Sequence, residues 1–254
     1  AERITGPMIA QACATSAACV RAAAMAVEQS ADPQRMELVV ATDRTSNSPL
    51  LVFPQPQAQG GAPMAENWVL ENFRRDPWTD KAMLVTGETV AAEGGFTREA
   101  IDDVTFMRFE QYQAALANDR AFQRRYMVPV ELPGTRRAPG RTLDSDAGIH
   151  PTTRDGLANL KPASPGGVMT FGAQTHPADG CAGMVVTTRD RARALSQEGV
   201  AQILAVGTGR VGPAEMPKAP VPAAQAALKA AGLTIDSIDV VTTHNPFAVN
   251  DLWF

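Results

Sequence analysis

The chain has 254 residues, of which 44% are hydrophobic and 20% are charged, and its formal net charge is −4. This composition indicates a globular protein with a sizeable core, long enough for one large domain or two ordinary ones. The acidic balance gives no reason to expect nucleic acid or an anionic membrane as a partner. No apolar stretch is long enough to predict a membrane span.

Cysteine usage limits the classes of site. The three cysteines, Cys13, Cys19 and Cys181, are an odd number without a C-x-x-C pair, which fits neither a disulfide framework nor a zinc site. We therefore expect no metal, and a reducing, cytoplasmic compartment that suits a working thiol.

The first elements are an extended segment and a helix. Ile4–Ala10 is apolar and leads into Cys13, and Ala14–Gln29 is an almost unbroken run of helix formers. Met36–Ala41 is a short apolar run typical of a strand that is covered on both faces. This part of the chain predicts a strand, a sharp turn at Cys13, a helix and a second strand.

Helical patterns and an irregular stretch occupy the middle of the chain. Helices are predicted at Ala82–Glu93 and Thr97–Asn118, with Thr97 starting the second. Val128–Pro165 is rich in Pro, Gly and Arg and is too long for an ordinary loop. It is predicted to be a functional segment that extends from the main fold.

Strands and helices alternate again in the last third. The predicted strands are Gly183–Thr188, Ala201–Val211 and Ile238–Thr243, and the predicted helices are Arg189–Gln197 and Pro222–Ala231, the latter capped by Gly232. The whole pattern is α/β with a largely helical insertion.

Cys13 is the candidate nucleophile. A thiol on the first turn of a helix meets unpaired N–H groups and the positive end of the helix dipole, which favour the reactive thiolate. A small buried thiol in an alanine-rich helix is the alternative that the residues alone leave open.

Five segments, in order along the chain, together resemble the thiolase family of acyl-CoA C-acyltransferases. They are Cys13–Ser16 (family C-x-S-G), Met83–Ala91 (M-G-x-T-A-E-N-V-A), Thr152–Ala163 (T-T-L-x-x-L-A-x-L-x-P-A-F), Thr170–Ala182 (T-A-G-N-A-S-G-x-N-D-G-A-A) and His244–Ala248 (N-E-A-F-A or H-D-C-F). Each segment is weak by itself, and the ordered series carries the resemblance.

The resemblance implies a fold and a division into domains. We expect a thiolase-like layered α/β/α fold with a helical loop-domain insertion, incomplete at both ends. The expected parts are residues 1–44 and 178–199 of the N-terminal core domain, residues 45–177 of the loop domain over the coenzyme A site, and residues 200–254 of the C-terminal core domain.

The resemblance also assigns roles. Cys13 would form an acyl-enzyme, and His244 would hold an oxyanion-binding water or the thioester oxygen of the second substrate. Thr175, Phe247 and Met83 would contact the acyl-pantetheine chain. The reaction needs no cofactor, since coenzyme A is itself a substrate, and family members are homodimers or homotetramers. The residues alone leave two alternatives open. His244 could hydrogen-bond the carbonyl groups at a strand end, and Phe247 could pack in the core, and neither role would change the sequence pattern.

Departures from the family pattern limit which family properties are expected of this chain. Thr42–Thr45 replaces the usual G-G-x-E, Ala82 stands where short-chain members have a histidine beside the acyl pocket, and the sequence ends before the G-H-P and C-x-G-x-G segments. A second chain, or segments outside this sequence, are expected to supply that histidine and cysteine.

Several residues remain ambiguous. The arginines Arg120, Arg124, Arg125, Arg136, Arg137 and Arg141 form either a solvated face or a binding surface for coenzyme A phosphates. Cys19 and Cys181 are predicted to pack, His150 to lie at the surface, and His176 to lie outside the catalytic set.

Two other functions compete with a thiolase. A condensing enzyme of the ketoacyl-synthase type is disfavoured because Asn-Pro-Phe, rather than a glycine-rich segment, follows His244. A catalytically degenerate acyl-CoA-binding or scaffold subunit that works with a partner chain is favoured by the departures at Thr42–Thr45 and the absent terminal motifs.

Overall fold

A computed structural model describes residues 4–196 and 198–254, and these residues fall into two compact units. The first unit holds residues up to Thr86, His176–His244 and Phe254, and the second holds Gly87–Thr175 and Asn245–Trp253. The four-part domain division expected from the family resemblance remains a prediction.

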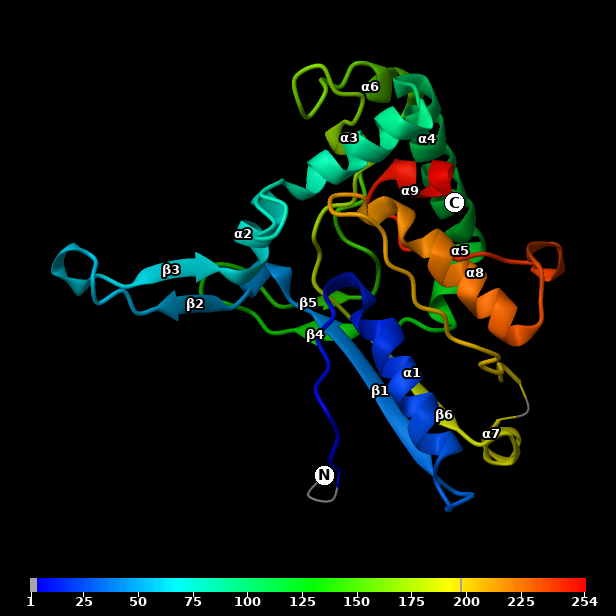
Figure 1. The fold of residues 1–254 in the computed structure, drawn as a ribbon. Coiled ribbons are helices and arrows are strands. Elements are labelled where there is room, and N and C mark those ends of the chain that lie inside the picture. The colour runs from blue at the N-terminus through cyan, green and yellow to red at the C-terminus, as the bar shows by residue number, and fades with distance from the viewer. Residues whose placement is uncertain (1–3, 197) are drawn as a thin grey trace. The chain divides into compact units, whose positions relative to one another are not determined.

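In the first unit, helix α1 (Thr15–Glu28) packs on a ribbon of two antiparallel strands, β1 (Met36–Asp43) and β6 (Gly180–Thr187), as Figure 1 shows. The contact buries Ala23 and Val27 of the helix against Val39 and Val186 of the strands. Cys19, Val20 and Ala24 pack against this cluster, at the three- and four-residue spacing of one helix face. The predicted packing of Cys19 is thus confirmed.

The opposite face of the ribbon is exposed, which corrects the expectation of a strand covered on both faces. Strand pairing places Leu38 opposite Val185 and Thr42 opposite Cys181 on that face. Leu38 is 65% exposed, Val185 is 52% exposed, and Cys181 is exposed rather than packed. The reason is that alternate residues of a strand point to opposite faces, and α1 covers one of them.

The rest of the first unit consists of short elements. A hairpin of β2 (Leu50–Phe53) and β3 (Met64–Asn67) extends away from the β1–β6 ribbon and leads into α2 (Trp68–Arg74) (Figure 1). Helices α7 (Arg189–Leu195) and α8 (Pro220–Ala231) follow β6. Gln197, the last residue of the helix predicted at Arg189–Gln197, lies outside the described residues.

Helix α8 confirms two local signals. The helix begins at Pro220, two residues before the predicted start, so that Pro222 lies in its first turn as expected, and Gly232 ends it in the left-handed conformation with φ 68°. The predicted strands Ala201–Val211 and Ile238–Thr243 are wrong, because neither segment belongs to a strand of the described chain. The first instead runs against α8, where a Cβ at Gly209 would lie 2.6 Å from the backbone nitrogen of Ala223.

The second unit is mostly helical. Helix α3 (Met83–Gly94) runs into it from the first unit, and α4 (Arg98–Ala115) begins with Thr97, whose hydroxyl accepts the N–H of Ala100 at 3.2 Å as predicted. The remaining elements are α5 (Ala117–Arg124), the β4–β5 hairpin (Val130–Leu132, Arg141–Leu143), α6 (Arg154–Ala158) and α9 (Ala248–Trp253).

Arg98 ties α4 to α6 in this unit. Its guanidinium binds Asp102 at 2.7 Å on its own helix and donates to the backbone carbonyl groups of Leu157 and Leu160. A charged donor at the carbonyl end of a helix satisfies groups that have no partner within the helix. The irregular stretch 128–165 is therefore held to the helical unit by an arginine. In the part of the chain that the structure describes, no helix is both long and apolar enough to cross a membrane.

Candidate active site

Cys13 lies in a short 3-10 turn, Ala12–Ala14, that leads directly into α1, and it is exposed. The predicted helix is confirmed, whereas the predicted strand before it is wrong, because residues 4–11 pair with no other segment of the described chain. Ala12 has φ 46°, in the left-handed region that residues with a side chain rarely adopt. Such backbone strain often occurs at functional sites, so it agrees with the choice of this turn as a candidate site.

The backbone N–H of Cys13 donates to no acceptor within the described residues, although the N–H groups of its neighbours Ala14 and Thr15 donate to the carbonyls of Gln11 and Ala12. An unpaired N–H beside a thiol can donate to negative charge that develops on a carbonyl oxygen attacked by that thiol. The turn therefore presents a nucleophile and a donor on the same residue.

His244 is exposed and belongs to the same unit as Cys13. Among the residues that the structure describes, no hydrogen bond or ion pair joins the His244 imidazole to Cys13. The pairing of these two residues expected from the family remains a prediction.

The structure brings together the segments that carry Thr175 and Phe247. The Thr175 N–H donates to the carbonyl of Pro246 at 2.8 Å, and Gln174 forms a β-bridge with Phe247. Phe247 is buried, and a Cβ at Gly87 would lie 3.4 Å from its ring. The Thr175 side chain is exposed beside this bridge. Contact of either residue with an acyl-pantetheine chain stays a prediction.

Met83 is half-buried at the first turn of α3, where its carbonyl accepts the Thr86 hydroxyl at 2.7 Å. The same helix carries Glu88, which the sequence interpretation did not select. Its carboxylate accepts the Ser164 hydroxyl at 3.0 Å and the N–H groups of Val168 and Met169 at 3.0 and 3.1 Å. A carboxylate in the middle of the mostly apolar helix α3 was the available signal.

A second missed group fixes the turn after His244. The Asn245 amide donates to Asp251 at 2.9 Å, and the same Asp251 oxygen accepts the Arg108 Nε–H at 2.7 Å. This hydrogen bond raises the pKa of the Arg108 guanidinium above its usual value, so the guanidinium stays charged. The H-N-P-F segment is thereby tied to α9 and α4.

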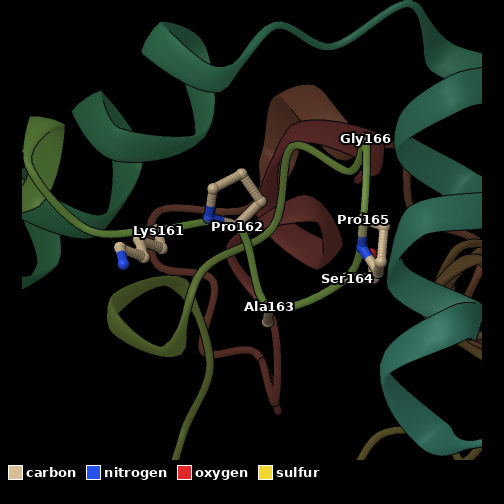
Figure 2. Close-up of a pocket in the computed structure, with 6 residues that line it drawn as sticks. All are labelled: Lys161, Pro162, Ala163, Ser164, Pro165 and Gly166. Atoms are coloured by element: carbon tan, nitrogen blue, oxygen red, sulfur yellow. The ribbon is translucent and has the colours of Figure 1, made fainter.

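The loop that Glu88 holds encloses a shallow, open hollow of about 360 Å³. Figure 2 shows its lining as one continuous stretch of chain, Lys161, Pro162, Ala163, Ser164, Pro165 and Gly166. None of the five predicted site residues lines it. In the described residues, no group of three His, Cys, Asp or Glu side chains is arranged to hold a metal ion.

The arginine-rich stretch divides into paired and exposed members. Arg120 binds Asp144 at 3.0 Å and Arg124 binds Asp119 at 2.6 Å, whereas Arg136 and Arg137 lie exposed in the β4–β5 turn. Both the solvated-face and the phosphate-binding interpretation therefore remain. His150 and His176 are exposed.

Family models match almost the whole chain. Residues 1–190 match the thiolase N-terminal domain and residues 197–253 match the thiolase C-terminal domain. The chain belongs to the thiolase family.

Curated relatives agree with this thiolase assignment. The chain is 30% identical over 224 residues to a probable acetyl-CoA acyltransferase of Staphylococcus epidermidis, covering 85% of this chain and 55% of the relative. It is 35% identical over 173 residues to a 3-ketoacyl-CoA thiolase of Stutzerimonas stutzeri, covering 67% of this chain and 44% of the relative. The chain thus spans about half the length of these relatives.

Solved structures establish the thiolase fold. The crystal structure of human mitochondrial 3-ketoacyl-CoA thiolase superposes with a TM-score of 0.80 at 23% identity, over 95% of this chain and 60% of that one. The acetyl-CoA acetyltransferase from Syntrophomonas wolfei gives a TM-score of 0.77 over the same shares. The expected α/β fold class is confirmed.

Proposed function

We propose that this thiolase-family chain takes part in acyl transfer between coenzyme A thioesters, with Cys13 as the nucleophile. The observation that carries the proposal is the exposed Cys13 in a strained turn at the start of α1. The turn lies within the stretch that matches the thiolase N-terminal domain. Relatives named acetyl-CoA acyltransferase and 3-ketoacyl-CoA thiolase support the reaction class.

The proposed reaction has two steps. The Cys13 thiolate attacks the carbonyl carbon of an acyl-CoA, a new S–C bond forms, and coenzyme A leaves as its thiolate, which takes up a proton. A second acyl-CoA, deprotonated at the carbon next to its carbonyl, then attacks the acyl-enzyme and releases Cys13. Cleavage of a 3-ketoacyl-CoA by coenzyme A is the reverse. The covalent intermediate divides one difficult step into two easier ones.

The other candidate residues receive supporting roles in this proposal. His244 orients an oxyanion-binding water or the thioester oxygen of the second substrate, and the Cys13 N–H faces the oxyanion of the first step. Thr175, Phe247 and Met83 contact the acyl-pantetheine chain. No cofactor is used, because coenzyme A enters and leaves as a substrate.

Selective acylation of Cys13 tests the proposal. The chain is incubated with radiolabelled acetyl-CoA, and the label is mapped by peptide mass spectrometry in the unaltered chain, in Cys13→Ala and in Cys181→Ala. Cys181 is a matched control because its thiol is also exposed. Label on Cys13 that survives in Cys181→Ala and is lost in Cys13→Ala is the expected result. Label on both cysteines, or on neither, would favour a non-catalytic acyl-CoA-binding subunit.

We also propose a homodimer or homotetramer and a cytoplasmic location. The location rests on three free cysteines, two of them exposed, which persist as thiols in a reducing compartment. Light scattering of the purified chain measures the assembly, and a monomer at micromolar concentration would contradict the proposed oligomer.

A further inference from the structure

The turn that presents Cys13 is closed mainly by one side chain, that of Thr15. The Thr15 hydroxyl accepts the Gln11 N–H at 2.8 Å and donates to the carbonyl of Ala12, also at 2.8 Å. The backbone N–H of Thr15 donates to the same Ala12 carbonyl. Thr15 therefore uses both capacities of its hydroxyl on the two residues that precede Cys13.

These contacts hold a conformation that the backbone would otherwise leave. Ala12 is left-handed with φ 46°, a conformation that is strained for a residue with a Cβ and persists only when the surroundings hold it. Its carbonyl is fixed by Thr15 from two directions, and the chain before it is fixed through the Gln11 N–H. Releasing Thr15 would free Ala12 to return to a common conformation, and the direction of Cys13 would change with it.

We propose that Thr15 is a positioning residue for Cys13: its hydroxyl locks the left-handed Ala12 and so fixes the thiol and the free N–H of Cys13 in the reactive orientation. This proposal rests on the proposed function of Cys13. Serine carries the same donor and acceptor, whereas valine has nearly the shape of threonine and carries neither. The two substitutions therefore separate the hydroxyl from the volume of the side chain.

The test compares Thr15→Val and Thr15→Ser with the unaltered chain and with Thr153→Val. Thr153 is a matched control because its hydroxyl caps another helix, α6, where it accepts the Gly156 N–H at 3.0 Å. Two rates are measured at one pH: alkylation of Cys13 by iodoacetamide, and acylation by acetyl-CoA over a range of concentrations. The Cys13→Ala variant gives the background of the other cysteines.

Thr15→Val is expected to slow both rates about tenfold, which corresponds to ~1.4 kcal/mol, with the half-saturating acetyl-CoA concentration unchanged. Thr15→Ser should stay within about twofold of the unaltered chain because its hydroxyl makes the same contacts. Thr153→Val should leave both rates unchanged. Equal losses in Thr15→Val and Thr15→Ser, or none in either, would overturn the proposal.

The alkylation measurement keeps this inference separate from the proposed function. If acetyl-CoA does not acylate Cys13 at all, the proposed function fails, and the iodoacetamide rates still decide the role of Thr15. If the Thr15→Val variant does not fold, hydrogen exchange of the unaltered chain tests the closed turn instead. The Gln11 amide should exchange its hydrogen more slowly than the neighbouring amide of Met8, and equal exchange would refute the closed turn.

Discussion

The contacts of Glu88 with its loop predict how much a substitution of Glu88 lowers the stability of the chain. Substitution Glu88→Ala removes the acceptor of three hydrogen bonds, from the Ser164 hydroxyl and from the N–H groups of Val168 and Met169. A hydrogen bond to a charged group contributes about 1.5–3 kcal/mol to stability when it is shielded from water. Met169 is fully buried, so water cannot replace the acceptor of its N–H group.

The expected loss is smaller than the sum of three shielded bonds. Glu88 and Val168 are half-buried, so water takes over part of the hydrogen bonding when the carboxylate is removed. We expect Glu88→Ala to lower the free energy of unfolding by about 2–4 kcal/mol, a large share of the 5–15 kcal/mol of an ordinary domain. Glu88→Gln keeps one acceptor oxygen and should lose about half as much.

Urea denaturation followed by circular dichroism measures the loss, and hydrogen exchange locates it. The Val168 and Met169 amides should exchange faster in Glu88→Ala, while amides of the β1–β6 ribbon keep their rates. Glu110→Ala is the control, because Glu110 is exposed on α4 and its loss should stay within about 0.5 kcal/mol. Equal stability of Glu88→Ala and Glu110→Ala would refute the reasoning.

Two further predictions concern the first unit. In Gly207→Ala the new Cβ would overlap the backbone oxygen of Ala223 in α8, so urea denaturation should show a loss of about 1–3 kcal/mol, and a loss no larger than that of Gly6→Ala, where the Cβ meets no atom within 4 Å, would contradict this. The Ser46 hydroxyl and N–H donate to the Asp179 carboxylate and lower the pKa of this carboxyl below its unfolded value. The resulting stabilisation is therefore present above about pH 4 and is lost as the pH falls through the folded pKa. Asp179→Asn should therefore lower the urea midpoint at pH 7 and flatten its fall toward pH 2, and parallel curves for the two proteins would show that this carboxyl does not titrate with folding.

Helices were predictable from the sequence because their signals are local. Thr97 caps α4 through the N–H three residues ahead, and Gly232 ends α8 with a positive φ, so each signal lies within a few residues of the structure it determines. The candidate residue Cys13 was found in the same way, from its place before a run of helix formers. The left-handed Ala12 beside it carries no such signal, since alanine is an ordinary helix former.

Strands and long-range contacts were less predictable, because they depend on partners elsewhere in the chain. Both Ala201–Val211 and Met36–Ala41 contain apolar runs that predict a strand, and only the second pairs with another strand among the described residues. The contacts of Glu88 join residues about 80 positions apart, and the link from Arg108 to Asp251 spans 143 positions. Spacing along one sequence does not show which residues such side chains meet.

The exposed face of the β1–β6 ribbon shows what an apolar run does and does not determine. A strand with one face in water alternates apolar and polar residues, whereas the run Leu38-Val39-Val40 has no polar member. Helix α1 leaves Val39 only 7% exposed, while Val40 remains 56% exposed on the other side. The run Leu38-Val39-Val40 is thus suited to burial on both faces, and the described chain covers one of them. The residues of a strand indicate which of its faces favour burial. Whether each face of β1 is buried depends on the elements that pack against it.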